Sequence, residues 1–236
     1  MIPKTIHYCW FGGKEKPKLA KKCIDSWKKY CPEYKIIEWN ETNFDVNSNG
    51  YTRYCYENKK WAYLSDFVRL LVVAEHGGIY FDTDVELIKK PDELLVYDAY
   101  FGFETDSTIN TGLGFGAVKN SPVIESMIQQ YSQMQPDENG NYSTTNCPKL
   151  NTAALIPLGL KLDGTRQNIC GAEILPIDYL NPYDNPTGRL TKTTNTFSIH
   201  WYSKSALSKG QVIRSKISRP LHRLLGVNFF TKTKRS

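Results

Sequence analysis

One stretch of the sequence, residues 61–87, restricts the fold more than any other. Apolar residues recur every three or four positions over residues 61–76, which predicts an amphipathic helix with one buried face. Two glycines follow, and glycine readily adopts the left-handed conformation that ends a helix. Apolar residues 79–81 then predict a short buried strand, which runs directly into Asp82-Thr83-Asp84. A helix leading into a buried strand is typical of an α/β fold.

The rest of the chain continues this α/β pattern. Further strands are predicted over residues 5–9, 34–39, 85–88, 100–103, 113–118 and 197–200, and further helices over residues 18–30 and 122–134. The order strand, helix, strand near the N-terminus favours parallel strand pairing. Residues 135–150 are polar and rich in turn-forming residues, so we expect a long loop there.

Length and composition favour one domain, over residues 1–208, followed by a tail over residues 209–236. The 236 residues are 40% apolar and 23% charged, which permits a sizeable core and excludes collagen, coiled coils and wholesale disorder. No apolar run approaches the roughly 20 residues that span a bilayer, and the N-terminus lacks the apolar segment of a signal peptide. The six cysteines have no metal-site spacing, so we expect a cytoplasmic protein with reduced thiols.

Charge is distributed unevenly along the chain. Residues 185–236 carry 11 lysines and arginines and no acid, whereas residues 1–184 carry 19 basic and 24 acidic residues. Apolar and basic residues alternate at helical spacing in the tail, which is typical of a segment lying on an anionic membrane surface. We therefore expect peripheral attachment to the cytoplasmic face of a membrane; the alternative is a solvated helical face. The acidic body argues against nucleic acid as a partner.

Two carboxylates directly after a buried strand indicate a cation site. Asp82 and Asp84 repel each other unless a cation lies beside them. Mg²⁺ and Mn²⁺ prefer oxygen ligands and accept phosphate as a further ligand, so a metal here could hold a diphosphate. Asp66 and Arg69 lie three positions apart and share one helix face. They form either an exposed ion pair or a contact to ribose or sugar hydroxyls beside the two aspartates.

Residues 64–87, LSDFVRLLVVAEHGGIYFDTDVEL, resemble glycosyltransferase family 32, the DXD sugar-binding group. That group includes bacterial capsular and surface-polysaccharide transferases and yeast mannosyltransferases, and is distantly similar to the glucosylating domains of large clostridial toxins. The opening IPKTIHYCWFGG resembles the first strand and Trp-x-Gly loop of the family, and the likeness is dense over residues 1–118. The resemblance implies a GT-A-type fold over residues 1–208, with a mostly parallel central sheet flanked by helices.

The resemblance also implies a nucleotide-sugar donor and several residues that bind it. By motif position, Trp10 would stack on the nucleotide base, Asp66 and Arg69 would contact the sugar and ribose region, and Tyr80 would line the nucleotide pocket. The alternative for Trp10 is a core side chain of the first strand. A tryptophan beside a small glycine loop suits uracil, which favours a UDP-sugar, with GDP-mannose as the other option.

Three residues of the DXD region would take part in catalysis if the resemblance holds. Asp82 would bind ribose and sugar hydroxyls and reach a Mn²⁺ or Mg²⁺ ion through water, and Asp84 would bind that ion directly. Asn110 opens a turn before a strand and would face the donor sugar. The alternative for Asn110 is a turn or helix cap.

A late element, residues 200–205, resembles the family's His-His-aromatic-x-x-Ser-Trp sequence. His200 would be a metal or diphosphate ligand, and Ser205 would contact metal or phosphate. The sequence departs from the family at Trp201, which replaces the second histidine, and at Ala206, where tryptophan is usual. A structural role is the alternative for His200.

The resulting prediction is a metal-dependent, retaining hexosyltransferase that extends a surface glycan, such as a capsule, or a lipid-linked oligosaccharide. Retention could follow front-face attack or a covalent intermediate; because no residue is a convincing nucleophile, the front-face route is favoured. A phosphatase or phosphotransferase with Asp82 as nucleophile is a second hypothesis, although Val85-Glu86 does not suit it. A non-enzymatic carbohydrate- or nucleic-acid-binding module is the third.

Overall fold

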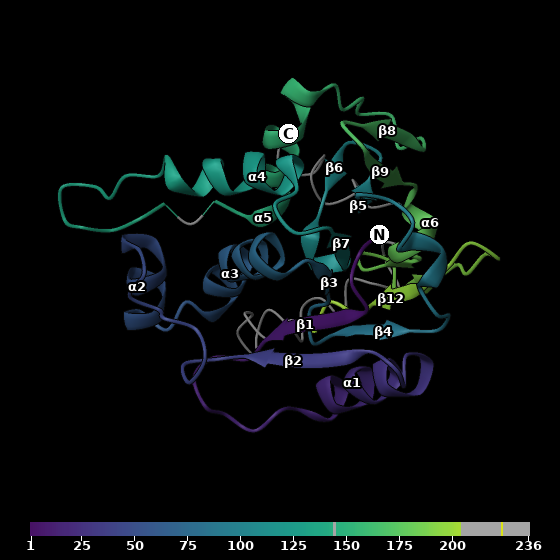
Figure 1. Ribbon diagram of the computed structural model, residues 1–236, viewed down its shortest axis with the longest axis horizontal. Helices are drawn as coiled ribbons and strands as arrows, with labels where there is room; N and C mark the ends of the chain where they lie inside the picture. The colour runs from purple at the N-terminus through teal and green to yellow at the C-terminus, as the bar shows by residue number, and fades with distance from the viewer. Residues whose placement is uncertain (144, 204–222, 224–236) are drawn as a thin grey trace.

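An eight-stranded mixed sheet forms the centre of the computed structural model, which describes residues 1–143, 145–203 and 223 (Figure 1). The strand order is β2-β1-β3-β7-β5-β9-β8, and β6 pairs with β5. The bounds are β1 Thr5–Cys9, β2 Lys35–Trp39, β3 Gly78–Tyr80, β5 Ala99–Thr105, β6 Thr108–Ile109, β7 Phe115–Ala117, β8 Gln167–Ile169 and β9 Ala172–Leu175. Strands β1, β2, β3, β5 and β9 point one way and β6, β7 and β8 the other, so the sheet is mainly parallel in direction.

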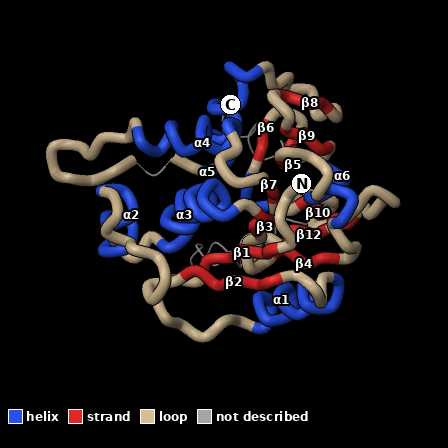
Figure 2. Tube along the Cα trace, viewed as in Figure 1, coloured by secondary structure: helices blue, strands red, loops and turns tan. Residues whose placement is uncertain are grey.

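Helices cover both faces of this sheet (Figures 1 and 2). The α-helices are α1 Lys18–Tyr30, α2 Gly50–Glu57, α3 Trp61–His76, α4 Pro122–Ser132, α5 Cys147–Leu155 and α6 Ile177–Leu180, with 3-10 turns at Asp92–Leu94, Thr111–Leu113 and Ile156–Leu158. Side chains of α1 share one core with Ile6 and Ile79, whereas α3 and α4 share the other core with Tyr80. The alternation of strand side chains explains why neighbours such as Ile79 and Tyr80 enter different cores.

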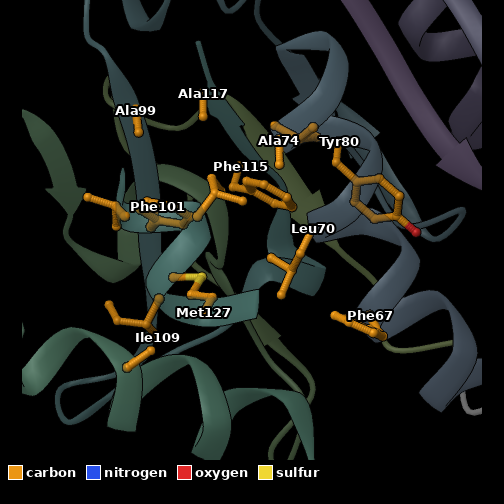
Figure 3. Close-up of a cluster of buried hydrophobic side chains, with 14 of the residues drawn as sticks. Phe67, Leu70, Ala74, Tyr80, Ala99, Phe101, Ile109, Phe115, Ala117 and Met127 are labelled. Atoms are coloured by element: carbon orange, nitrogen blue, oxygen red, sulfur yellow. The ribbon is translucent and has the colours of Figure 1, made fainter. Parts of the chain in front are cut away.

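The core between α3, α4 and the sheet holds the helix that precedes the two aspartates. Phe67, Leu70 and Ala74 of α3 lie along the cluster that contains Phe115 and Tyr80 (Figure 3). This packing accounts for the apolar periodicity of residues 61–76, because each turn of α3 contributes a side chain to the same buried face. Helix α3 and strand β3 are therefore fixed relative to one another before the chain reaches Asp82.

Two further strand pairs lie beside the main sheet. Strand β12 (Ser198–His200) pairs antiparallel with β4 (Val85–Leu87), and β10 (Tyr183–Asp184) pairs with β11 (Arg189–Leu190). The β4–β12 pairing returns a late segment of the chain to the residues that directly follow the DXD sequence.

Most predicted elements are present, with bounds shifted by a few residues, and the α/β prediction is confirmed. The predicted loop 135–150 is wrong at its end, where Asn146 caps α5 by accepting a hydrogen bond from the backbone NH of Lys149. Helix α2 and strands β8 and β9 were not predicted. The predicted boundary at residue 208 lies outside the described residues. None of the helices in the described ranges combines the length and apolar character needed to cross a membrane.

Candidate active site

The two aspartates of the DXD sequence lie at the carboxyl edge of β3. Phe81, which follows β3 and precedes Asp82, is buried in the core. The backbone NH of Val85 donates to the carbonyl of Asp82 across a tight turn. Strand β1 is parallel to β3 and ends at the same edge, where Trp10 follows. In open α/β sheets, this edge is where ligands bind.

Asp82, Asp84 and His200 form a group able to hold a metal ion. One ligand atom from each residue lies within 4.8 Å of the others, and the described residues contain this one group of three or more such side chains. His200 reaches the group because β12 pairs with β4 in a register that sets it opposite Val85. The structure thus brings His200 beside the two aspartates, while its role as a ligand stays a prediction.

Asp84 and His200 are tightly coupled. His200 Nε2 lies 3.1 Å from Asp84 Oδ1, and the backbone NH of Ser203 donates to Asp84 Oδ2 at 2.6 Å. Burial alone would raise the pKa of Asp84, but His200 and the hydrogen bonds outweigh it and hold that pKa below its ordinary value. Burial opposes a charge on His200, yet Asp84 raises the pKa of His200 overall. Asp84 is consequently an ionised carboxylate at neutral pH.

Arg69 joins Asp66 to the DXD segment. Its Nη2 lies 2.8 Å from Asp66 Oδ1 and 3.0 Å from Asp82 Oδ1, and the arginine side chain is only 3% exposed. The exposed ion pair considered for these residues is therefore wrong. Burial raises the pKa of Asp66 to about 6 despite the guanidinium. Arg69 fixes the orientation of Asp82, while contact of Asp66 and Arg69 with a donor stays a prediction.

Asn110 lies beside the same cluster and caps the turn Thr111–Leu113. Its Oδ1 accepts from the backbone NH of Gly112 at 2.7 Å, which confirms the capping interpretation. A Cβ at Gly112 would lie 2.7 Å from Asp82 Oδ2 and 3.0 Å from Asn110 Oδ1, so only glycine permits this close approach. Asn110 is thus near Asp82, and its contact with a donor sugar stays a prediction.

Trp10 and Tyr80 differ in how they could reach a ligand. Trp10 is half-buried, its Nε1 donates to the carbonyl of Lys14 at 2.6 Å, and the Lys16 ammonium lies 5.6 Å from its ring. It is therefore not a fully buried core side chain. Tyr80 is 1% exposed, and its hydroxyl donates to Asp82 Oδ1 at 3.1 Å. Tyr80 acts on the site through Asp82; base stacking by Trp10 and nucleotide binding by Tyr80 stay predictions.

Sequence reasoning missed several residues around this cluster. Glu104 Oε1 accepts hydrogen bonds from Asn110 Nδ2 at 3.0 Å and from Tyr202 Oη at 3.1 Å. Thr111 and Cys147 lie beneath Arg69, whose Nη1 is 3.4 Å from Thr111 Oγ1. A carboxylate at the end of an apolar strand, as in AYFGFET, was a signal that could have identified Glu104. Ser205, predicted to contact metal or phosphate, lies outside the described residues.

Comparison with known proteins supports the interpretation that a sugar-transferring site lies at the carboxyl edge of β3. The family described as glycosyltransferase sugar-binding region containing DXD motif matches residues 17–101. Inositol phosphoceramide mannosyltransferase 3 of Schizosaccharomyces pombe is 27% identical over 139 residues, covering 54% of this chain and 36% of the relative. Mannosyl phosphorylinositol ceramide synthase SUR1 of Saccharomyces cerevisiae is 28% identical over 113 residues, covering 42% and 27%. The chain thus matches only about a third of the length of these relatives.

The fold agrees with the sequence match. The solved structure named PaToxG Glycosyltransferase has a TM-score of 0.51 and 20% identity, covering 66% of this chain and 69% of that one. The sequence match, the GT-A-type fold and the DXD site define one class, the DXD-containing glycosyltransferases. Residues 17–101 match this class in sequence and the fold agrees with it, which is consistent with the resemblance to glycosyltransferase family 32.

Proposed function

We propose that the protein transfers a sugar from a nucleotide-diphosphate donor to a hydroxyl group of a glycan or glycolipid, with a divalent metal ion at Asp82, Asp84 and His200. One observation carries the proposal. Three side chains with metal-binding atoms, from two segments far apart in the sequence, converge within 4.8 Å at the carboxyl edge of β3. The buried guanidinium of Arg69 orients one of them from a third segment.

The donor set suits Mn²⁺ or Mg²⁺. Two carboxylates and one imidazole match the ligand preferences of Mn²⁺ in particular. His200 Nε2, 3.1 Å from Asp84 Oδ1, is the ring nitrogen that faces the carboxylates, and it would bind a metal ion after losing its proton. When bound, the metal would hold the diphosphate and offset the negative charge that grows on it as it leaves.

The protein side chains would orient the donor sugar and hold the charged groups around it in place. Arg69 holds Asp82 in place, and Asp82 and Asp66 would accept hydrogen bonds from ribose and sugar hydroxyls. The bond between the sugar C1 and the diphosphate oxygen breaks with its electron pair on the diphosphate, and the acceptor oxygen bonds to C1. In the front-face route, which retains configuration, the departing phosphate oxygen takes the acceptor proton. Positioning, rather than a strong base, would supply most of the rate.

The donor proposed from the sequence is a UDP-sugar, because a partly exposed Trp10 beside Gly12 and Gly13 suits a small base. The names of the two yeast relatives concern mannosyl transfer, so GDP-mannose is the competing donor. A surface glycan or lipid-linked oligosaccharide remains the proposed acceptor, and the basic tail the proposed contact with an anionic membrane.

Thermal-shift measurements with UDP, GDP, UDP-hexoses and GDP-mannose, each with and without Mn²⁺, test the proposal. A nucleotide at 100 times its Kd should add about 2.7 kcal/mol of stability, and only when Mn²⁺ is present. Asp84→Ala should lose this response while remaining folded, whereas Asp25→Ala, at an exposed position on α1, should keep it. Metal-independent binding, or no binding of any nucleotide by the folded wild type, would overturn the proposal.

A further inference from the structure

A pocket of about 660 Å³ opens next to the DXD cluster. Its walls come from residues 104–106 at the end of β5, from residues 177–178 and 181–186 in and after α6, from Thr191 and Thr193, and from Tyr202. This volume is in the range of small-molecule sites. The pocket is separate from the residues assigned above to the metal and the donor.

Two residues connect this pocket to the DXD cluster. Glu104 lines it and accepts from Asn110 Nδ2, which lies beside Asp82. Tyr202 lines it as well, donates to the same Glu104 oxygen, and has its ring centre 4.1 Å from that of His200. Both hydrogen bonds that the Glu104 carboxylate accepts from described side chains end on Oε1, which leaves Oε2 able to accept one from a bound molecule. A molecule in the pocket would therefore lie next to the place where the donor sugar is proposed to bind.

The pocket wall is acidic and has no lysine or arginine among its described lining residues, although Arg223 donates to the carbonyls of Thr187 and Gly188 just beyond it. It contains four carboxylates, those of Glu104, Asp106, Asp178 and Asp184, and none of them forms an ion pair with a described lysine or arginine. Carboxylates accept hydrogen bonds from hydroxyl and ammonium groups and repel phosphate. Repulsion between these carboxylates and a negatively charged ligand would disfavour that ligand and so contribute to specificity.

Asn181 gives an independent indication that a ligand binds here. It lines the pocket, is 6% exposed, and donates through Nδ2 to the backbone carbonyl of Glu104 at 3.1 Å. Its Oδ1 is buried without a hydrogen-bond partner in the described part of the chain. Buried amide oxygens are seldom left unpaired, and a ligand hydroxyl or ammonium group would supply the missing donor.

We propose that this pocket is the acceptor subsite, that it takes a sugar unit that is neutral or carries an amine, and that it rejects phosphate-bearing acceptors. The proposal rests on the proposed function, because it assigns the second substrate of that reaction. Glu104 is the residue at the junction: it accepts a hydrogen bond from the acceptor and, through Asn110, is coupled to the donor side.

Saturation-transfer NMR with Mg²⁺ and UDP present tests the assignment directly. The probes are the methyl glycosides of glucose, galactose and mannose, free glucosamine, and the 6-phosphates of the same hexoses. We expect at least one neutral or amino sugar to bind ten times more tightly than its 6-phosphate counterpart. Thr191→Trp fills the pocket from an exposed position whose side chain makes no hydrogen bond in the described structure, and should weaken that binding at least tenfold.

Asp106→Lys should narrow the difference between neutral and phosphorylated sugars, and Asp25→Lys on α1 is the matched control that should change neither. The inference is overturned if no sugar binds wild type, if the phosphates bind equally well, or if Thr191→Trp has no effect. UDP or GDP binding in the same samples separates the two proposals. Loss of nucleotide binding by wild type contradicts the proposed function, whereas intact nucleotide binding with an unresponsive pocket contradicts the acceptor subsite alone.

Discussion

Replacing Arg69 by methionine tests whether this buried guanidinium holds the site together. Methionine keeps most of the apolar stem but removes the charge between Asp66 and Asp82. Removing one partner of a buried ion pair costs roughly 3–5 kcal/mol, because the remaining charges lose their compensation. Since the Asp82 side chain is 26% exposed and partly hydrated, we expect the lower end, about 3 kcal/mol.

Urea denaturation followed by circular dichroism measures this loss. For a chain of this size, about 3 kcal/mol corresponds to a fall in Tm of roughly 6–12 °C. Adding Asp66→Asn to Arg69→Met should recover part of the stability, because the asparagine leaves one fewer unpaired buried carboxylate. Nucleotide binding with Mn²⁺ should stay impaired in the double variant, since Asp82 has lost the partner that orients it.

Arg53→Met is the control, because this arginine is exposed on α2 and should change stability by less than about 0.5 kcal/mol. If Arg69→Met unfolds within 1 kcal/mol of wild type, the charges around Asp82 are compensated in another way and the reasoning is refuted. Equal stability of the single and double variants would likewise show that Asp66 and Arg69 are not coupled.

Four further predictions follow. Asp84→Asn should lose Mn²⁺-dependent turnover nearly as completely as Asp84→Ala, because asparagine keeps the shape of the side chain and removes its charge. Near wild-type activity of Asp84→Asn would contradict the assignment of Asp84 to a metal site. Trp10→Phe should weaken UDP binding by about 1–2 kcal/mol in a titration, with little change in stability. Burial lowers the pKa of His7 to about 4, so unfolding free energy should fall by about 3 kcal/mol from pH 6.5 to 4, and His7→Gln should remove that slope. Truncation after residue 208 should abolish salt-sensitive sedimentation with anionic vesicles and leave transfer to a soluble acceptor intact; unfolding of the truncated protein would instead favour a tail packed on the domain.

The sign of the His7 prediction follows from its two hydrogen bonds. Trp39 Nε1 donates to His7 Nδ1 at 3.0 Å, and His7 Nε2 lies 2.9 Å from the carbonyl of Gly77. The neutral ring with its proton on Nε2 satisfies both contacts, whereas a protonated Nδ1 would face a donor. Between pH 6.5 and 4 the unfolded chain therefore binds a proton that the folded chain does not. The free energy of unfolding consequently decreases as the pH is lowered.

Elements with a long, regular apolar pattern could be predicted from the sequence. The helix 61–76 and the strand 5–9 were predicted with the bounds that the structure has, because each pattern is local and agrees with its tertiary packing. Helices α2 and α5 were missed although Asn49 and Asn146 cap them, since each spans only two or three turns and presents few apolar positions. Short helices of this kind are stabilised by packing rather than by propensity.

Local sequence patterns alone could predict the site only where its residues are close in sequence, whereas His200 was assigned to the site by the family resemblance. Asp82 and Asp84 can be recognised in the sequence because they lie in one turn. The contact between His200 and Asp84 depends on the β4–β12 pairing, which no local pattern specifies. Glu104 and Asn181 lie 77 positions apart and meet only because α6 packs on β5. The pocket that they line was therefore invisible in the sequence.

The region that matches the family and the region that lines the proposed acceptor pocket are different parts of the chain. The family match covers residues 17–101, which supply Asp66, Arg69 and the DXD aspartates and end just before Glu104. The proposed acceptor pocket is lined by residues 104–106, 177–178, 181–186, 191, 193 and 202, all beyond the matched region. The family match therefore lies on the side of the site where the donor is proposed to bind. An acceptor that carries phosphate would meet four carboxylates in this pocket. The acceptor of this protein should consequently be sought among neutral and amino sugars.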